Sequence, residues 1–73
     1  MVGDFIRDNV IREQGCKISH KALYENYVRY CFDLGVKPNS KNKFGRMMNE
    51  FGYGANVNYC GVRMHKGIRL RKE

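Results

Sequence analysis

The chain has 73 residues, which allows one small domain with a compact core and leaves little room for a buried active site. Its apolar share of 42% is enough for a globular core and argues against a disordered chain, and no apolar run has the roughly 20 residues that cross a bilayer. Lysine and arginine total 14 against 7 acidic residues, which gives a formal net charge of +7.

The excess positive charge lies in the C-terminal half of the chain. Residues 1–36 carry five cations and five carboxylates, whereas residues 37–73 carry nine cations and only Glu50 and Glu73. A neutral half followed by a strongly basic half is typical of a polyanion-binding face. The alternative is a solvated basic surface without a partner.

The N-terminal segment predicts a helix over residues 2–13, followed by a short strand. Apolar residues recur near the helical spacing of 3.6, at Val2, Phe5, Ile6 and Val10. Gly15 suits the left-handed position at which many helices end. Residues 16–18 are then expected to be extended.

The next segment predicts a second helix, which Ser19 caps and which ends at Gly35. Its apolar stripe follows one face, at Leu23, Tyr27, Cys31 and Leu34. Tyr24, Tyr27 and Tyr30 are spaced by three along one side of this helix. That spacing favours a core or core-edge role for the tyrosines over base stacking.

A turn over residues 36–39 separates the second helix from a third, because Pro38 lacks an N–H group and disfavours helix at the residue before it. Ser40 is the expected N-cap of the third helix, which runs to about Phe51. Its core stripe consists of Phe44, Met47, Met48 and Phe51. Gly45 costs this helix about 1 kcal/mol relative to alanine, which indicates close approach by a hairpin or by a DNA backbone, unless the glycine is simply tolerated.

The C-terminal segment changes to the alternation that is typical of a half-buried strand, over residues 62–71. One predicted face is apolar, with Val62, Met64, Ile68 and Leu70. The other is basic, with Arg63, His65, Arg69 and Arg71. Lys66 and Gly67 interrupt the alternation, and residues 56–59 are the expected hairpin partner, with a turn at Cys60 and Gly61.

This order of elements predicts an α+β fold of the winged helix-turn-helix type, as one domain over residues 1–73, with three helices and a small antiparallel sheet of two to three strands. In such folds the second helix of the pair enters the major groove, so the third helix is expected to contact DNA. Its candidate DNA-binding residues are Lys41, Asn42, Lys43, Arg46 and Asn49. The hairpin adds Arg63, His65, Lys66, Arg69, Arg71 and Lys72. Arginine can bond guanine, asparagine can bond adenine, and lysine neutralises phosphate.

No signal in the sequence indicates catalysis, a metal site or another cofactor. Cys16, Cys31 and Cys60 form no paired spacing, which favours a reducing intracellular compartment over a disulfide framework. Neither they nor His20 and His65 have the spacing of a zinc site, and His20 is expected at the surface. The chain lacks a phosphate-binding loop and clustered carboxylates, so we expect no enzyme.

Two stretches carry a family resemblance, residues 23–53 and residues 67–71. They contain an LY-x2-Y motif, an aromatic–cysteine pair at residues 30–31, FGR at residues 44–46, a glycine–aromatic pair at residues 52–53, and a closing GIRLR. In this order the motifs resemble the C-terminal domain of the phage and plasmid primase-helicase family, which includes poxvirus-type primase-helicases. A weaker similarity is to RFX-type winged helices, which share the LY-x2-Y and FG elements.

The primase-helicase resemblance implies a winged helix at the C-terminus of a larger viral, phage or plasmid replication protein, behind a primase region and a hexameric AAA+ motor. In such proteins the terminal domain engages origin or template DNA, in the host cytoplasm, the nucleoid or a viral replication site. Tyr30 stands where many relatives have tryptophan, which changes packing more than function. The RFX similarity implies DNA contact led by the hairpin, or wing, rather than by the third helix.

Three hypotheses for function follow. The first is double-stranded DNA binding through the third helix and the hairpin, by a domain that is monomeric on its own and does not bind membranes. The second is a protein-interaction module that docks on a replication partner or on the rest of the hexameric helicase through the tyrosine-rich second helix. The third is single-stranded nucleic acid binding through Tyr53 and Tyr59, which can stack on bases or cover the sheet. Fold alone does not separate these hypotheses.

Overall fold

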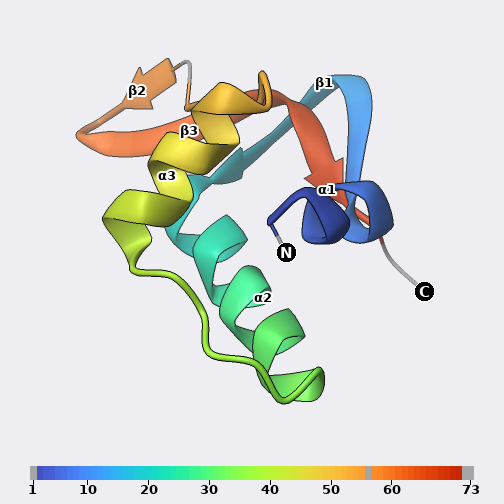
Figure 1. Cartoon of the computed structure of the whole chain (residues 1–73). Helices are drawn as coiled ribbons and strands as arrows, with labels where there is room; N and C mark the ends of the chain where they lie inside the picture. The colour runs from blue at the N-terminus through green and yellow to red at the C-terminus, as the bar shows by residue number, and fades with distance from the viewer. Residues whose placement is uncertain (1, 56, 72–73) are drawn as a thin grey trace.

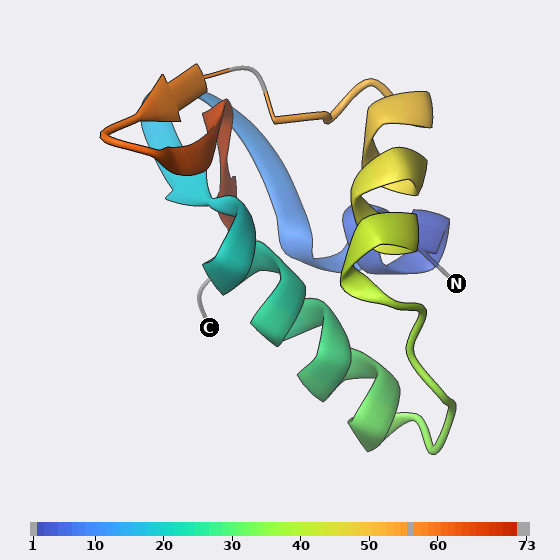
Figure 2. The same cartoon turned by 90° about the vertical axis from the view of Figure 1, so that its left-hand side faces the viewer.

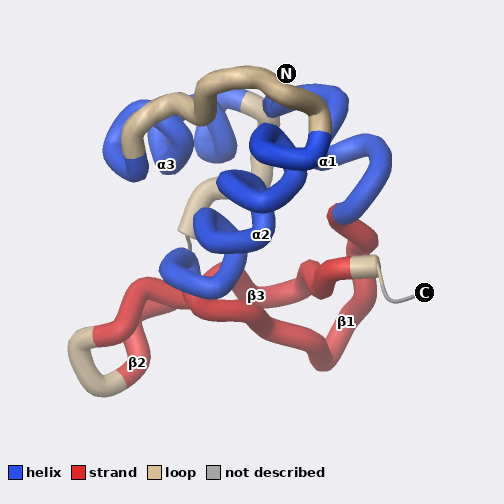
Figure 3. The backbone as a smooth tube through the Cα atoms, turned by 90° about the horizontal axis from the view of Figure 1, so that it is seen from below, coloured by secondary structure: helices blue, strands red, loops and turns tan. Residues whose placement is uncertain are grey.

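In the part of the chain that the computed structural model describes, residues 2–55 and 57–71, three helices lie on one face of a three-stranded antiparallel sheet (Figure 1, Figure 3). The elements follow in the order α1 (Val2–Asn9), β1 (Val10–Ser19), α2 (His20–Asp33), α3 (Lys41–Glu50), β2 (Val57–Tyr59) and β3 (Val62–Leu70). Strand β3 lies between β1 and β2 in the sheet. The predicted α+β architecture of three helices and a small sheet is therefore confirmed. Over these same residues, no helix has the length and apolar character that crossing a membrane requires.

Serine side chains begin both longer helices, as the sequence predicts. The Ser19 hydroxyl accepts a hydrogen bond from the Ala22 N–H at 3.1 Å, and the Ser40 hydroxyl accepts one from the Lys43 N–H at 3.2 Å. Each bond satisfies a backbone donor that the first helical turn leaves without a partner. α2 is followed by Gly35 in the left-handed region, with φ of 72°. The expected start and end of the second helix are thus confirmed.

The first helix is shorter than predicted and the first strand is longer. α1 stops at Asn9, and β1 continues through residues 10–13, which were predicted to be helical. β1 pairs with β3 from Val10, opposite Leu70, to Ser19, opposite Met64. This long-range ladder overrides the helical spacing of the apolar residues, and a β-branched residue such as Val10 is suited to a strand.

Gly15 lies within β1 and does not end a helix. Its φ of 90° falls in the region that favours glycine, and it lies where the pairing register with β3 shifts, between Arg12 and Lys17. The glycine therefore permits a bulge in a continuous strand. The prediction that it caps a helix was wrong because local sequence does not distinguish these two uses of a positive φ.

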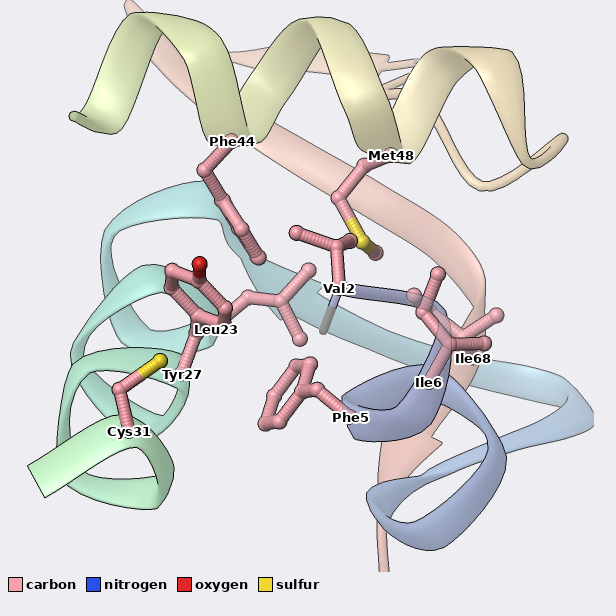
Figure 4. Packing of buried hydrophobic residues seen from close by; sticks show 9 residues of the cluster. All are labelled: Val2, Phe5, Ile6, Leu23, Tyr27, Cys31, Phe44, Met48 and Ile68. Carbon is pink, nitrogen blue, oxygen red and sulfur yellow. The ribbon is translucent and has the colours of Figure 1, made fainter. Parts of the chain in front are cut away.

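The core lies between the helices and the sheet. Its buried apolar side chains are Val2, Phe5, Ile6, Leu23, Tyr27, Cys31, Phe44, Met48 and Ile68 (Figure 4). Phe44 points from α3 toward α2, where its ring stacks on that of Tyr27 with centroids 4.6 Å apart. Phe5 of α1 makes an edge contact with Tyr27 at 5.6 Å. Tyr24 and Tyr30 are half-buried at the edge of the core, which confirms the core-edge role predicted for them.

The last residue of each predicted helical stripe is exposed. Leu34 is 58% exposed and Phe51 is 50% exposed, so their assignment to the core was wrong. Each residue forms the C-cap of its helix, just beyond the turns that rest on the core. Met47 is half-buried and packs against the core.

The two faces of β3 are reversed, relative to the prediction, over the first half of the strand. His65, predicted on the outer basic face, is 1% exposed. Val62, predicted in the core, is 48% exposed, and Met64 lines a small hollow on the sheet. Gly67 has φ of 90° at the register shift, where the alternation changes phase. Beyond it, Ile68 packs into the core as predicted.

The predicted hairpin turn at Cys60 and Gly61 is confirmed. These residues have φ of 52° and 78°, the two positive values that a type I′ turn requires. β2 pairs with β3 across this turn, with Tyr59 opposite Val62. Asn56, which was predicted to begin the partner strand, lies outside the described residues.

Candidate nucleic-acid interface

α3 and the β2–β3 hairpin lie on the same side of the molecule, with the N-terminal end of α2 between them (Figure 2). Phe44 and Met48 hold one side of α3 in the core. The opposite side is therefore exposed, and it carries Lys41, Asn42, Lys43, Arg46 and Asn49. The structure places these five side chains where the helical phase predicts them, and their contact with DNA stays a prediction.

A hollow of about 420 Å³ lies between the N-terminal ends of α2 and α3 and the hairpin turn, and we call it the α2–α3 hollow. Three cations from three elements line it: Lys21 of α2, Lys41 of α3 and Arg63 of β3. Its other lining residues are His20, Asn42, Gly61 and Val62. Helix N-termini carry partial positive charge, so the backbone adds to the positive potential of the three side chains.

Arg63 also lines a second hollow, of about 390 Å³, along the exposed side of α3. The other lining residues of this second hollow are Gly45, Arg46, Asn49, Gly54 and Ala55. Arg63 is therefore shared by the two hollows and connects the hairpin to both ends of the exposed face of α3. The predicted helix residues and this one hairpin arginine form a continuous polar and basic surface.

Two other predicted hairpin residues do not reach this surface. His65 is buried, because the first half of β3 turns that face toward the helices. Lys66 lies with Lys17 and Met64 along a separate small hollow on the sheet. The prediction placed His65 on the outer face of the strand, which the phase of β3 does not allow.

The predicted residues at the end of β3 lie away from the hairpin. Nε of Arg69 donates to a carboxylate oxygen of Glu13 in β1 at 3.0 Å. The backbone N–H of Arg71 donates to the Asn9 carbonyl oxygen at 2.7 Å, at the α1 end of the sheet. Both residues therefore belong to a different part of the surface from α3. Lys72, which was predicted with them, lies outside the described residues.

Sequence reasoning missed two residues of the α2–α3 hollow. Lys21 was not assigned a role, and His20, expected at the surface, is only 4% exposed. The Ser19 cap signal correctly places both residues at the start of α2. Their approach to β3 depends on the fold of distant segments, which local sequence does not encode.

The side chains of His20 and His65 form a hydrogen-bonded pair at the base of the α2–α3 hollow. Nδ1 of His20 lies 2.9 Å from Nε2 of His65, and Nδ1 of His65 lies 2.7 Å from the Tyr53 carbonyl oxygen. Because a carbonyl oxygen only accepts, His65 donates from Nδ1 and, when neutral, accepts at Nε2. His20 then donates from Nδ1. The one unprotonated nitrogen left for a further proton is Nε2 of His20.

Burial keeps both rings neutral at pH 7. It lowers the pKa of His20 to about 4, and the charges of Arg63 and Lys41, together with any proton on His65, act in the same direction. Hydrogen bonding to the Lys41 backbone opposes this shift. Burial also lowers the pKa of His65, against the opposing effect of its hydrogen bond to Tyr53.

We expect the domain to lose stability on mild acidification. Because the pKa of His20 is lower in the folded chain than the ordinary value of 6.5, the unfolded chain binds the proton first. The free energy of unfolding therefore falls as the pH falls from about 6.5 to about 4. At 1.36 kcal/mol per pKa unit, His20 contributes up to roughly 3 kcal/mol to this loss, and His65 adds to it. Denaturant titrations at about pH 7 and about pH 5 measure the effect. An equal free energy at both values would contradict a buried neutral pair.

Gly45 is explained by the same pair. A Cβ atom at this position would lie 3.2 Å from Nε2 of His20, which is tighter than nine in ten Cβ contacts. The expected close approach to Gly45 is real, and its neighbour within the described chain is the His20 side chain of α2 rather than the hairpin. Close approach by a DNA backbone stays a prediction. Within residues 2–55 and 57–71, no three histidine, cysteine or acidic side chains converge as a metal site. No disulfide joins Cys16, Cys31 and Cys60.

A family model described as the RFX DNA-binding domain matches residues 1–66. No curated protein matches the chain significantly. The matched region includes α1 through most of β3, so it covers every element of the candidate interface. The RFX-type similarity seen in the sequence is borne out, whereas the primase-helicase resemblance receives no support from this match.

Proposed function

The chain belongs to the RFX DNA-binding domain family, and from that membership we propose that α3 and the β2–β3 hairpin together form its surface for double-stranded DNA. The domain binds duplex DNA, as the family assignment indicates. Winged-helix domains of this kind typically act by binding alone, so we assign no catalytic step. The finer proposal concerns which residues make the contact and in which protein the domain works.

The observation that carries the proposal is the position of Arg63, which lines both hollows beside α3. It brings a cation of the hairpin next to Lys41 and Arg46 of the helix. Cations that neutralise DNA phosphates release counterions, and this release supplies much of the affinity for duplex DNA. A surface that combines such cations with exposed asparagine side chains has donors for phosphates and for base edges.

We assign base reading to α3 and phosphate contact to the hairpin. Arg46 and Asn49 lie on the exposed side of α3, where a helix in the major groove presents its side chains. The alternative, which the RFX similarity favours, is that the hairpin reads bases and α3 contacts the backbone. Both arrangements use the same surface, and the sequence dependence of binding distinguishes them.

We expect Arg46→Ala to cost roughly 1–3 kcal/mol of affinity for a preferred duplex and to flatten the sequence preference. Lys43→Ala is the matched control on the same exposed helix, and it should weaken all duplexes alike, as the loss of one phosphate contact does. Selection from a random duplex pool measures both variants. If Arg46→Ala acts uniformly and Arg63→Ala erases the preference, the hairpin reads bases. Unchanged selection by all three variants would exclude base reading by this surface.

We also propose that the domain serves a viral, phage or plasmid replication protein with a hexameric primase-helicase motor. This proposal is supported by the ordered motifs of residues 23–53 and 67–71. The lack of a disulfide among the three cysteines supports a reducing, intracellular compartment. The primase-helicase proposal predicts an AAA+ motor in the same polypeptide. A full-length coding sequence without such a motor would contradict the proposal.

Exposed apolar residues at the C-terminal end of α2 support a second candidate function, docking on the parent helicase. Phe32 is 81% exposed, and Leu34 and Val36 are exposed beside it in sequence. The tyrosines of α2 are not this surface, since they are buried or half-buried. This end of α2 points away from the hairpin (Figure 1), so docking and DNA binding are compatible. Phe32→Ser should abolish coprecipitation with the motor region while duplex affinity stays unchanged, and retained coprecipitation would exclude this site.

A further inference from the structure

The α2–α3 hollow has the composition of a phosphate-binding site. Lys21, Lys41 and Arg63 reach it from three different elements, and Asn42 adds an amide donor. No carboxylate is among the described residues that line it. The first turns of α2 and α3 both border the hollow, so their backbone dipoles add to the same positive potential. A singly charged, oxygen-rich group such as a phosphodiester fits this set of donors.

The buried histidine pair lies directly against this hollow. His20 lines it and is only 4% exposed, and His65 is held below by its hydrogen bond to the Tyr53 carbonyl oxygen. The tautomers fixed by these bonds leave Nε2 of His20 as the site for an added proton. A proton there can be donated to the Lys41 backbone, the contact that already favours the charged ring.

The charges around the pair oppose that proton when the hollow contains no anion. Besides burial and the neighbouring ring, the groups that disfavour a charged His20 are Arg63 of β3 and Lys41 of α3. These two cations are also lining residues of the hollow, together with Lys21. An anion placed among them offsets their charge and attracts a positive imidazole ring.

We propose that the α2–α3 hollow binds one phosphodiester group of the DNA backbone, and that the His20–His65 pair takes up one proton from solvent when the hollow is filled. The proposal rests on the proposed DNA-binding surface and assigns one of its contacts. In the step itself, a hydronium ion of the solvent gives up one O–H bond, an N–H bond forms at Nε2 of His20, and a water molecule remains. Linkage requires that a proton taken up on binding also strengthens binding as the pH falls.

The test is an NMR titration of the two histidine rings in the full chain, with and without a short blunt-ended duplex at low salt. Because burial lowers the pKa of His20 to about 4, we expect the midpoint of the free protein there. We expect the duplex to raise this midpoint by roughly 1.5–2 units, which by linkage makes binding about two- to fourfold tighter at about pH 5.5 than at about pH 7. Histidine is the side chain whose ordinary pKa lies in this window, so other side chains add little to the change.

Two lysine variants of α3 distinguish phosphate binding in the α2–α3 hollow from a general attraction of DNA to positive charge. Lys41→Gln removes a cation of the hollow, so it should raise the His20 midpoint in the free protein and abolish most of the further rise with duplex. Lys43→Gln removes the same charge from an exposed position that does not line the hollow. It should weaken duplex binding and preserve the full midpoint shift. Both positions are exposed, so amide spectra should show that both variants stay folded.

The outcomes distinguish this proposal from the DNA-binding proposal. Duplex binding with an unchanged His20 midpoint, or equal effects of the two lysine variants on the shift, would overturn the phosphate subsite and leave the duplex-binding surface in place. No binding of duplex by the wild-type chain even at low salt would overturn the DNA-binding surface itself. A raised midpoint that Lys41→Gln abolishes and Lys43→Gln preserves would establish the subsite.

Discussion

Phe44→Ala is expected to remove a large part of the stability of the domain. The Phe44 side chain is 0% exposed. Its ring centroid lies 4.6 Å from the ring centroid of Tyr27, 5.4 Å from that of Tyr24 and 6.2 Å from that of Phe5. Truncation of a buried phenylalanine typically costs about 3–5 kcal/mol. A 73-residue domain has roughly 4–11 kcal/mol of stability at the usual 0.05–0.15 kcal/mol per residue. The loss of this one ring is therefore a large fraction of the total, and it reaches the total at the low end of the range.

Phe32→Ala is the matched control, because Phe32 is the same residue type but is 81% exposed. Denaturant titrations followed by far-ultraviolet circular dichroism measure both variants. We expect Phe32→Ala to stay within about 0.5 kcal/mol of the wild type, as surface substitutions usually do. Equal midpoints for the two variants would contradict the central position of Phe44 in the core.

The parts of the fold that the sequence predicts well depend on local signals. Ser19 and Ser40 are N-caps because a serine hydroxyl meets a backbone donor three residues later. The turn at Cys60 and Gly61 follows from Gly61, because glycine accepts a positive φ at the tip of a hairpin. The exposed side of α3 follows from the helical period once the core residue Phe44 is recognised.

The parts that the sequence does not predict depend on pairing between distant segments. Val10 shares helical spacing with α1, yet it pairs with Leu70 and begins a long strand. Gly67 interrupts the alternation of β3, and the phase change at this glycine buries His65. A histidine in a basic alternating strand is indistinguishable from its neighbours until its partner, His20, is known.

The candidate interface also contains residues that local sequence predicts and residues whose positions depend on distant pairing. The residues of α3 were predictable because one helix fixes their relative positions. Arg63, Arg69 and Arg71 looked equivalent in the sequence, but only Arg63 lies beside α3. Arg69 instead pairs with Glu13 in β1, a contact that requires the register of the sheet.

Arg63→Ala is expected to weaken duplex binding more than other single substitutions on this surface. The residue lines both hollows, so its guanidinium can serve contacts at both ends of the exposed face of α3. Hydrogen bonds to charged groups contribute about 1.5–3 kcal/mol each, which corresponds to roughly ten- to 150-fold in Kd. The salt dependence should also decrease, because each lost phosphate contact lowers the slope of log K against log salt by about 0.9.

Arg71→Ala is the control that makes this result specific. It removes the same charge from the same end of the chain, so the net charge of the two variants is equal. Arg71 lies at the α1 end of the sheet, where its backbone bonds to Asn9. A molecule that attracts DNA by net charge alone would respond equally to both substitutions.

The most direct test is therefore the binding of one labelled duplex by the wild-type chain, Arg63→Ala and Arg71→Ala, measured by fluorescence anisotropy over a series of salt concentrations. If α3 and the hairpin form the binding surface, Arg63→Ala loses affinity by about tenfold or more and has a shallower salt slope, while Arg71→Ala matches the wild type. Equal losses for the two variants, or a larger loss for Arg71→Ala, would contradict the assignment of duplex binding to this surface.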